Sequence, residues 1–256
     1  MTYGANIPAA ARLLLAYVAV KESGGDYNVV YGHHQGELAK PITRMTLAEL
    51  TAAQARLGRR YGSSAAGKYQ HLRKTLLAQV KRLGIPMTAL FSPGLQDDLG
   101  WDLLRQRGLD RFLAGELSRS AFGNALAQEW ASLPVLMTVT DAKGRKHVRG
   151  RSWYAGDGLN AAGRKAEHFE KALDEALAVH RAEKPAGGDK PSPATPLPDD
   201  PGTAAQPPLL PPDAPDEPDG EDFYRGSEPI TAIRLRWIVA FIIVAALAVL
   251  IWRAFA

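Results

Sequence analysis

A glutamate and two glycines stand close together near the N-terminus, in the segment Lys21-Glu22-Ser23-Gly24-Gly25. The apolar run 13–20 before this segment predicts a helix, and helical spacing places Glu22 on the same face as Leu14 and Val18. The glycines are typical of a helix end. Desolvation raises the pKa of a carboxyl group half in the core, as a general acid working near neutral pH requires. Periodicity alone leaves open the alternative of a solvent-facing glutamate.

Other common kinds of reactive site are not indicated. The six histidines show no metal-ligand spacing such as HExxH, and no serine lies in a nucleophile-elbow pattern. Neither Gly62-Ser63-Ser64 nor Gly67-Lys68 completes a phosphate-binding loop. The chain has no cysteine, which excludes disulfides and thiolate metal sites. We therefore expect neither a metal nor a cofactor.

The elements that would position Glu22 are mostly short helices. Thr46-Leu47-Ala48-Glu49 is a capping box, and Ser92-Pro93 is an N-cap followed by proline at the first helical position. A hairpin around residues 141–144 is expected to join strands 135–140 and 145–150. We predict an α+β, mainly α-helical fold with small β-hairpins, in which a short strand spans 28–32 and the later helices span about 46–57, 70–84, 92–108, 118–134 and 163–183.

The predicted hairpin arm is strongly basic. It carries Lys143, Arg145, Lys146, His147, Arg149 and Arg151. Such an arm could bind nucleic acid, but a solvated hairpin or a clamp on an anionic glycan fits at least as well, and we expect no nucleic-acid partner. Residues 1–184 as a whole have a formal charge of +9, which suggests an anionic partner such as acidic cell-wall polymer or a membrane surface.

Composition divides the chain into three parts. Of its 18 prolines, 13 lie in the segment 185–229, which also has ten acidic residues against two basic ones. Such a segment cannot bury enough apolar surface to fold, so it is predicted to be a disordered linker. The predicted organisation is a folded domain 1–184, a linker 185–229 and a C-terminal segment 230–256.

The C-terminal segment has the pattern of a membrane anchor. Residues 237–252 form 16 consecutive positions without a polar side chain, and arginines flank them on both sides. Arginines that snorkel and tryptophans at the interfaces let residues 233–255 cross a bilayer as one helix. Two arginines precede the span and one follows, which favours a cytoplasmic folded domain. Since no export signal is evident, the side of the membrane is left open.

Three motifs together resemble the phage lambda lysozyme family of endolysins. They are the helix ending in Glu-Ser-Gly-Gly, the run Ala-Gly-Lys-Tyr-Gln at 66–70, and Trp-Ala-Ser-Leu-Pro at 130–134. The resemblance covers about residues 10–180 and implies a lysozyme-like fold and cleavage of peptidoglycan by lytic transglycosylation. It also implies that Glu22 is the single catalytic glutamate and that Tyr69 and Gln70 line the saccharide-binding cleft. The predicted hairpin falls where the family has a mobile lip over the substrate.

The sequence leaves the roles of several predicted site residues open. Tyr69 could instead be a core residue, and Tyr154 could form the far wall of the cleft. Asp26 is a possible second carboxylate for a hydrolytic lysozyme, although Gly24-Gly25 is expected to break the helical spacing that would bring it beside Glu22. An inert, membrane-anchored wall-binding protein is a further alternative.

The linker and tail at 185–256 lie outside the resemblance. They predict attachment to the bacterial inner membrane, where a cytoplasmic domain would wait for a holin to open the membrane.

Overall fold

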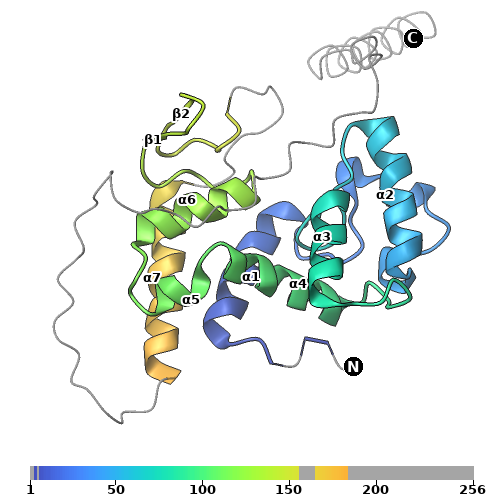
Figure 1. Cartoon of the computed structure of the whole chain (residues 1–256), viewed down its shortest axis with the longest axis horizontal. Helices are drawn as coiled ribbons and strands as arrows, with labels where there is room; N and C mark the ends of the chain where they lie inside the picture. Colours follow the sequence, from blue (N-terminus) through green and yellow to red (C-terminus); the bar gives the residue numbers. More distant parts are fainter. Residues whose placement is uncertain (1–2, 5, 156–164, 184–256) are drawn as a thin grey trace, which may run out of the picture. The chain divides into compact units, whose positions relative to one another are not determined.

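The computed structural model describes residues 3–4, 6–155 and 165–183, and in this part the chain is mainly helical with one small sheet. The α-helices are α1 (Ala9–Glu22), α2 (Leu47–Tyr61), α3 (Arg73–Leu83), α4 (Pro93–Gln106), α5 (Leu109–Leu113), α6 (Arg119–Glu129) and α7 (Ala166–Glu183). Two 3-10 helices, η1 (Tyr31–Glu37) and η2 (Ile42–Arg44), precede α2. Figure 1 labels the α-helices and colours the chain by its sequence. The predicted α+β class is confirmed.

Local signals fix most helix ends where they were expected. Thr46 and Glu49 form the predicted capping box of α2, and the Ser92 hydroxyl accepts a hydrogen bond from a first-turn amide of α4. Helix α2, however, continues past Gly58, which was predicted to end it. Gly62, in the left-handed conformation, ends it instead, because a glycine inside a helix costs only about 1 kcal/mol. The short helix α5 was not predicted.

The β-structure is smaller than predicted. Strands β1 (Val139–Thr140) and β2 (Lys146–His147) pair antiparallel and form the expected basic hairpin. The strand predicted over 28–32 is not formed. Only Val30 makes an isolated bridge to Ala66, because the chain turns into η1 directly afterwards. Among the described residues there is thus one hairpin rather than several.

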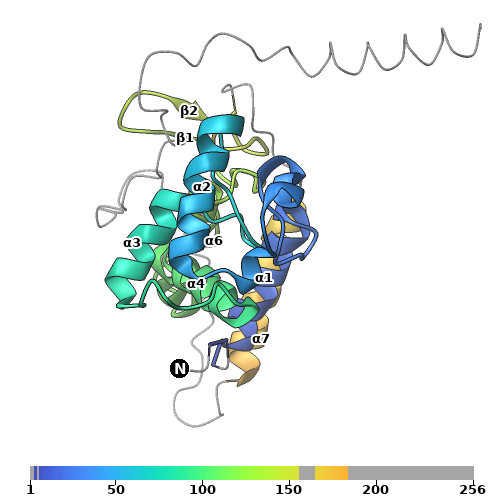
Figure 2. The ribbon, with the colours of Figure 1, turned by 90° about the vertical axis from the view of Figure 1, so that its right-hand side faces the viewer.

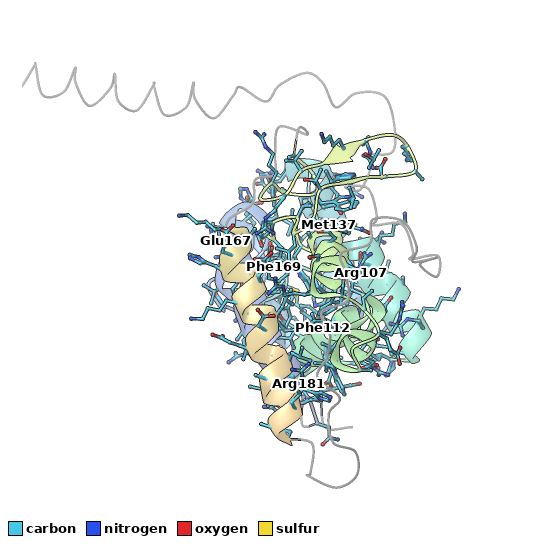
Figure 3. The ribbon with its side chains drawn as sticks, turned by 90° about the vertical axis from the view of Figure 1, so that its left-hand side faces the viewer. Arg107, Phe112, Met137, Glu167, Phe169 and Arg181 are labelled. Atoms are coloured by element: carbon cyan, nitrogen blue, oxygen red, sulfur yellow. The ribbon has the colours of Figure 1, made fainter. Side chains whose placement is uncertain are left out.

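The described residues pack around two hydrophobic clusters. The first joins α1, α5, α6, α7 and the C-terminal half of α4, and the second joins α2, α3 and the N-terminal half of α4. Figure 2 gives a second view of this arrangement, and Figure 3 views the molecule from the side of α7, with Phe169 of the first cluster labelled. Helix α4 contributes Leu95 and Leu99 to the second cluster and Leu103 and Leu104 to the first. It therefore joins the two.

Close packing brings α1 and α4 together beside the 66–70 segment. A Cβ atom on Gly100 would lie 2.9 Å from side-chain atoms of both Leu15 and Tyr69, so glycine permits this approach. The buried residues of α1 include Ala11, Leu14, Leu15 and Val18. This is the predicted inward face, and Glu22 continues it.

The predicted membrane anchor and linker belong to the C-terminal part of the chain. No helix within residues 3–4, 6–155 and 165–183 is long and apolar enough to cross a bilayer. The expected span 233–255 and the expected linker lie outside the described residues. By its internal contacts the chain separates into Met1–Glu217 and Pro218–Ala256, and everything described belongs to the first unit.

Candidate active site

Glu22 is the last residue of α1, at a sharply built helix end. The amides of Ser23 and Gly25 both donate to the Ala19 carbonyl, at 3.0 and 3.2 Å. Gly24 and Gly25 have φ values of 65° and 87°, which L-residues with side chains rarely adopt. The chain therefore leaves the helix directly after Glu22, and this carboxyl group stays on the inward face, intermediate between buried and exposed.

The immediate partner of this carboxyl group is a neutral hydroxyl. Ser132 Oγ donates a hydrogen bond to Glu22 Oε1 across 110 residues of sequence. Burial raises the pKa of Glu22, and hydrogen bonds from the Ser132 hydroxyl and backbone lower it by less. Among the described residues no charged group is a cause of this shift. Glu22 is thus a carboxyl group biased toward its protonated form, which is the state of a general acid.

The 67–70 loop joins the two chain segments that meet at Glu22 and Ser132. Ser23 Oγ donates to the Lys68 carbonyl at 2.8 Å, and Trp130 Nε1 donates to the Tyr69 carbonyl at 3.1 Å. Ser23 follows Glu22, and Trp130 lies two residues before Ser132. Two adjacent carbonyl groups therefore hold the end of α1 and the end of α6 in register.

Helix α4 holds the other side of this loop. Gln96 Oε1 accepts from the Lys68 amide at 2.9 Å, and Asp97 Oδ1 accepts from the Tyr69 hydroxyl at 2.6 Å. The Lys68 ammonium lies 3.2 Å from Asp97 Oδ1 and 4.5 Å from the centre of the Tyr27 ring. The lysine charge is consequently compensated by Asp97 of α4, and the loop is fixed on both sides.

The two loop residues predicted to line a cleft lie differently. Tyr69 is 1% exposed, and burial together with the Asp97 hydrogen bond raises the pKa of its phenol. Its side chain belongs to the core, which was the open alternative, and this burial argues against direct contact with a saccharide. Gln70 is partly exposed and has a φ of 51°, a left-handed conformation that is uncommon for a residue with a side chain. Its side-chain amide donates to the Gly67 carbonyl at 2.8 Å.

Asp26 and Tyr154 make hydrogen bonds to groups other than the Glu22 carboxyl. Asp26 is exposed and accepts from the Asn28 amide at 2.8 Å, beyond the two glycines that end the helix. The four-residue spacing to Glu22 is therefore not helical. Tyr154 is partly exposed, and its hydroxyl donates to the Gln128 carbonyl at 2.5 Å near the C-terminal end of α6.

The sequence of this chain matches a known protein family. A family model described as Endolysin matches residues 15–155, which is more than half of the chain. The chain belongs to the endolysin family. It is accordingly a peptidoglycan-cleaving enzyme of the kind that degrades cell walls. No curated protein and no solved structure matches the endolysin.

The matched range contains every element of the candidate site. It begins inside α1 and includes Glu22, the 67–70 loop, Ser132 and the hairpin, whereas α7 lies beyond it. Within the described part of the endolysin, no group of His, Asp and Glu side chains could hold a metal ion.

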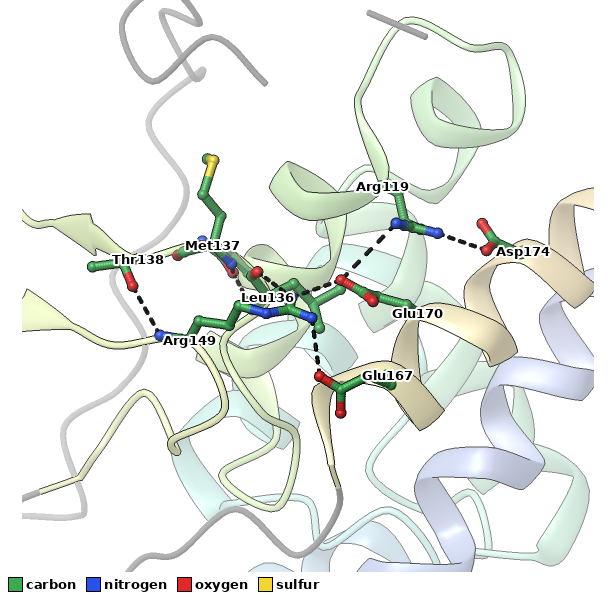
Figure 4. A network of polar contacts seen from close by, with 9 residues as sticks. Arg119, Leu136, Met137, Thr138, Arg149, Glu167, Glu170 and Asp174 are labelled. Carbon is green, nitrogen blue, oxygen red and sulfur yellow. Dashed lines mark hydrogen bonds and ion pairs between the residues drawn. The ribbon is translucent and has the colours of Figure 1, made fainter. Parts of the chain in front are cut away.

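The hairpin of the endolysin is fastened to α7 at its base (Figure 4). The Arg149 guanidinium donates to the Leu136 carbonyl and to Glu170, both at 2.6 Å, and lies 3.3 Å from Glu167. The Arg149 amide donates to the Thr138 hydroxyl at 3.0 Å. The Arg149 guanidinium thus binds groups at the base of the hairpin and on α7, and its charge is balanced by their carboxylates.

The tip of the hairpin is also internally bound. Arg145 pairs with Asp141 at 2.8 Å, and His147 stacks on the Trp153 ring with the centroids 3.7 Å apart. Of the predicted basic arm, Lys143, Lys146 and Arg151 remain exposed without an ion pair in the part of the chain that the structure describes. The positive surface of the hairpin is therefore smaller than its sequence suggests.

Sequence reasoning missed Ser132, Gln96 and Asp97 as site residues. Ser132 lies inside Trp-Ala-Ser-Leu-Pro, a motif used for the family resemblance, but nothing in that motif indicates a partner in α1. Gln96 and Asp97 belong to α4, and polar and charged side chains such as these are usually exposed to solvent. Only the packed structure brings them to the 67–70 loop.

Proposed function

We propose that this endolysin is a lytic transglycosylase that breaks the β-1,4 bond between N-acetylmuramic acid and N-acetylglucosamine, with Glu22 as the catalytic carboxyl group. The environment of Glu22 carries the proposal. Burial raises its pKa, a neutral hydroxyl is its hydrogen-bond partner, and among the described residues no second carboxylate is a cause of its pKa shift. One carboxyl group suffices when the substrate supplies its own nucleophile.

The reaction uses one proton that Glu22 gives and takes back. Protonated Glu22 donates to the glycosidic oxygen as the bond from that oxygen to C1 of the muramic residue breaks. The Glu22 carboxylate then accepts the proton of the muramic C6 hydroxyl while O6 bonds to C1. The products are a free 4-hydroxyl on the leaving glucosamine and a 1,6-anhydro-muramic end, and Glu22 is protonated again.

The alternative is a hydrolytic lysozyme. Such an enzyme would use a second carboxylate, here Asp26, to assist the attack of water on the glycosidic bond. The hydrogen bond that Asp26 accepts from the Asn28 amide does not favour this role. Gln70 and Tyr154 remain proposed contacts to the glycan. The Tyr69 side chain is proposed to act through the loop rather than by touching sugar, since it is 1% exposed.

Product analysis in isotopically labelled water tests the reaction. The full chain is incubated with peptidoglycan in H₂¹⁸O, and the muropeptides are measured by mass spectrometry. Transglycosylation gives anhydro ends without ¹⁸O, whereas hydrolysis gives reducing ends that carry ¹⁸O. The Asp26→Asn variant, which keeps an acceptor for the Asn28 amide, is expected to give the same products at a rate within about twofold of wild type. Reducing ends that carry ¹⁸O would show that the enzyme is a hydrolase and refute transglycosylation. Peptidoglycan that stays intact would refute catalysis and favour a wall-binding role.

We also propose that residues 233–255 anchor the enzyme in the bacterial inner membrane and that residues 185–229 act as a tether. The proposal is supported by the 16-residue apolar run and its flanking arginines. A flexible chain of this length reaches roughly 40 Å and an extended polyproline form up to about 140 Å. Such a tether would let the folded domain reach the wall. If that domain lies on the cytoplasmic side, a holin would first have to open the membrane. Flotation of the full chain with lipid vesicles tests the anchor.

A further inference from the structure

The loop that joins α3 to α4, together with the last residue of α3, exposes an unusual share of the apolar surface. Six large hydrophobic side chains are exposed within the described residues, and three of them lie in this segment. Leu83 is 43% exposed, Met87 36% and Leu90 50%. Exposed apolar residues are ordinary when scattered, but a cluster of them indicates an interaction surface.

This loop is firmly built, so its exposure does not come from a lack of structure. The Leu47 amide donates to the Ala89 carbonyl at 2.9 Å, and the Ala48 amide donates to the Met87 carbonyl at 3.0 Å. On the far side, the Phe91 amide donates to the Met45 carbonyl at 2.9 Å. The backbone is held by the N-terminal end of α2, and the three apolar side chains are left on the outside.

The exposed cations around the loop determine the kind of partner. Lys81 and Arg82 are exposed near the C-terminal end of α3, and Arg44 lies two residues before the bridge between Thr46 and Leu90. Arg82 binds Asp102, whereas Lys81 and Arg44 have no ion-pair partner in the described ranges. Residues 81–92 contain no acidic side chain. Apolar side chains flanked by uncompensated cations match an anionic bilayer surface, in which lipid phosphates lie above acyl chains.

We propose that Leu83, Met87 and Leu90 insert shallowly into an anionic phospholipid bilayer, with Lys81 and Arg44 at the level of the phosphates. The proposal rests on the proposed anchor only in that the anchor would keep the folded domain near such a surface. Figures 1 and 2 place this loop and the hairpin at opposite ends of the described part. A domain docked through the loop would direct the hairpin, and the Ser132 segment before it, away from the bilayer and toward the wall.

The absence of cysteine makes a site-specific test direct. The full chain with Met87→Cys carries an environment-sensitive fluorophore at that position and is bound to vesicles of phosphatidylglycerol and phosphatidylethanolamine. Val148→Cys, on the hairpin and 39% exposed, is the matched control. We expect a lipid-borne nitroxide to quench the label at position 87 but not at position 148. Equal and weak quenching at both positions would overturn the proposal.

Charge variants separate bilayer docking from self-association of the chain and from attachment through the anchor alone. In the labelled full chain, Lys81→Glu is expected to lower the ratio of docked to undocked molecules by at least about fivefold. This is the contribution of one lysine or arginine to binding at an anionic surface. Phosphatidylcholine vesicles should lower it as well. A spectral shift that appears without vesicles and grows with protein concentration would assign the loop to a second copy of the chain and overturn bilayer docking. Flotation of the chain without quenching at position 87 would support the anchor and refute the docking, and neither result depends on peptidoglycan cleavage.

Discussion

The C-terminal ends of α1 and α6 both place a glutamate in partly or largely buried surroundings, with opposite consequences. At the end of α6, Arg107 donates to Glu129 Oε2 through Nε at 3.0 Å and through Nη2 at 2.7 Å. These two side chains are only 8% and 14% exposed. At the end of α1, Glu22 has a serine hydroxyl as its partner, and burial raises its pKa. The charge of Glu129 is balanced by the Arg107 cation, whereas burial favours the protonated, neutral form of Glu22.

This difference separates a carboxylate held in an ion pair from the carboxyl group that we propose to be catalytic. A buried ion pair is held because removing either member leaves an uncompensated charge. A carboxyl group that burial biases toward protonation can instead release a proton to a substrate and recover it. The end of α6 also lies next to the site in sequence, since Trp130 follows Glu129 directly and Ser132 lies three residues after Glu129. The α6 pair therefore supports the segment from which Ser132 reaches Glu22.

The largest effect on activity is expected at Glu22. The Glu22→Gln substitution keeps the size of the side chain and an acceptor for Ser132, but it removes the transferable proton. Peptidoglycan cleavage should fall by about 10²- to 10⁴-fold, the usual contribution of general acid–base catalysis. Zymography and the release of soluble muropeptides measure the loss, and a thermal unfolding curve shows that the variant is folded. Equal clearing by the variant and wild type would remove Glu22 from the mechanism.

The corresponding change at Glu129 should act on stability. Glu129→Gln leaves the Arg107 guanidinium buried beside a neutral amide, which costs about 3–5 kcal/mol of unfolding free energy. Urea unfolding measures this cost. The control is Asp110→Asn, which breaks the exposed pair with Arg105 and should cost less than about 1 kcal/mol. If the two substitutions cost the same, the α6 pair is not the structural counterpart of Glu22.

The smallest of the three effects is expected at Ser132. Ser132→Ala removes one hydrogen bond to Glu22, so activity should fall by about 2- to 10-fold. The pH profile carries the sharper signal. The general acid must be protonated, so activity declines as pH rises through the Glu22 pKa. Because the Ser132 hydrogen bond lowers that pKa, its loss should move the decline to higher pH. Ser132→Thr keeps the hydroxyl and should restore the wild-type profile, whereas an unchanged profile in Ser132→Ala would contradict the assigned contact.

Much of the local structure followed from short-range signals. Thr46 and Ser92 identified helix starts because a side-chain oxygen satisfies an amide only three residues away. The inward face of α1 and its end at Gly24-Gly25 also followed, since helical period and glycine conformation involve few neighbouring residues. The strand expected over 28–32 failed for the complementary reason. A strand needs a partner from elsewhere, and here that partner supplies one bridging residue, Ala66.

The sequence by itself indicated the residue that we propose for catalysis, and it determined the helix that carries this residue, the basic hairpin and the uneven composition of the chain. Tertiary structure alone decided the environment of that residue. Ser132 meets Glu22 across 110 positions, Tyr69 is buried against Asp97 rather than open to sugar, and Arg145 and Arg149 of the hairpin form ion pairs. The reason is physical. A pKa is set by desolvation and by whichever groups lie within a few ångströms, and packing between distant segments chooses those groups.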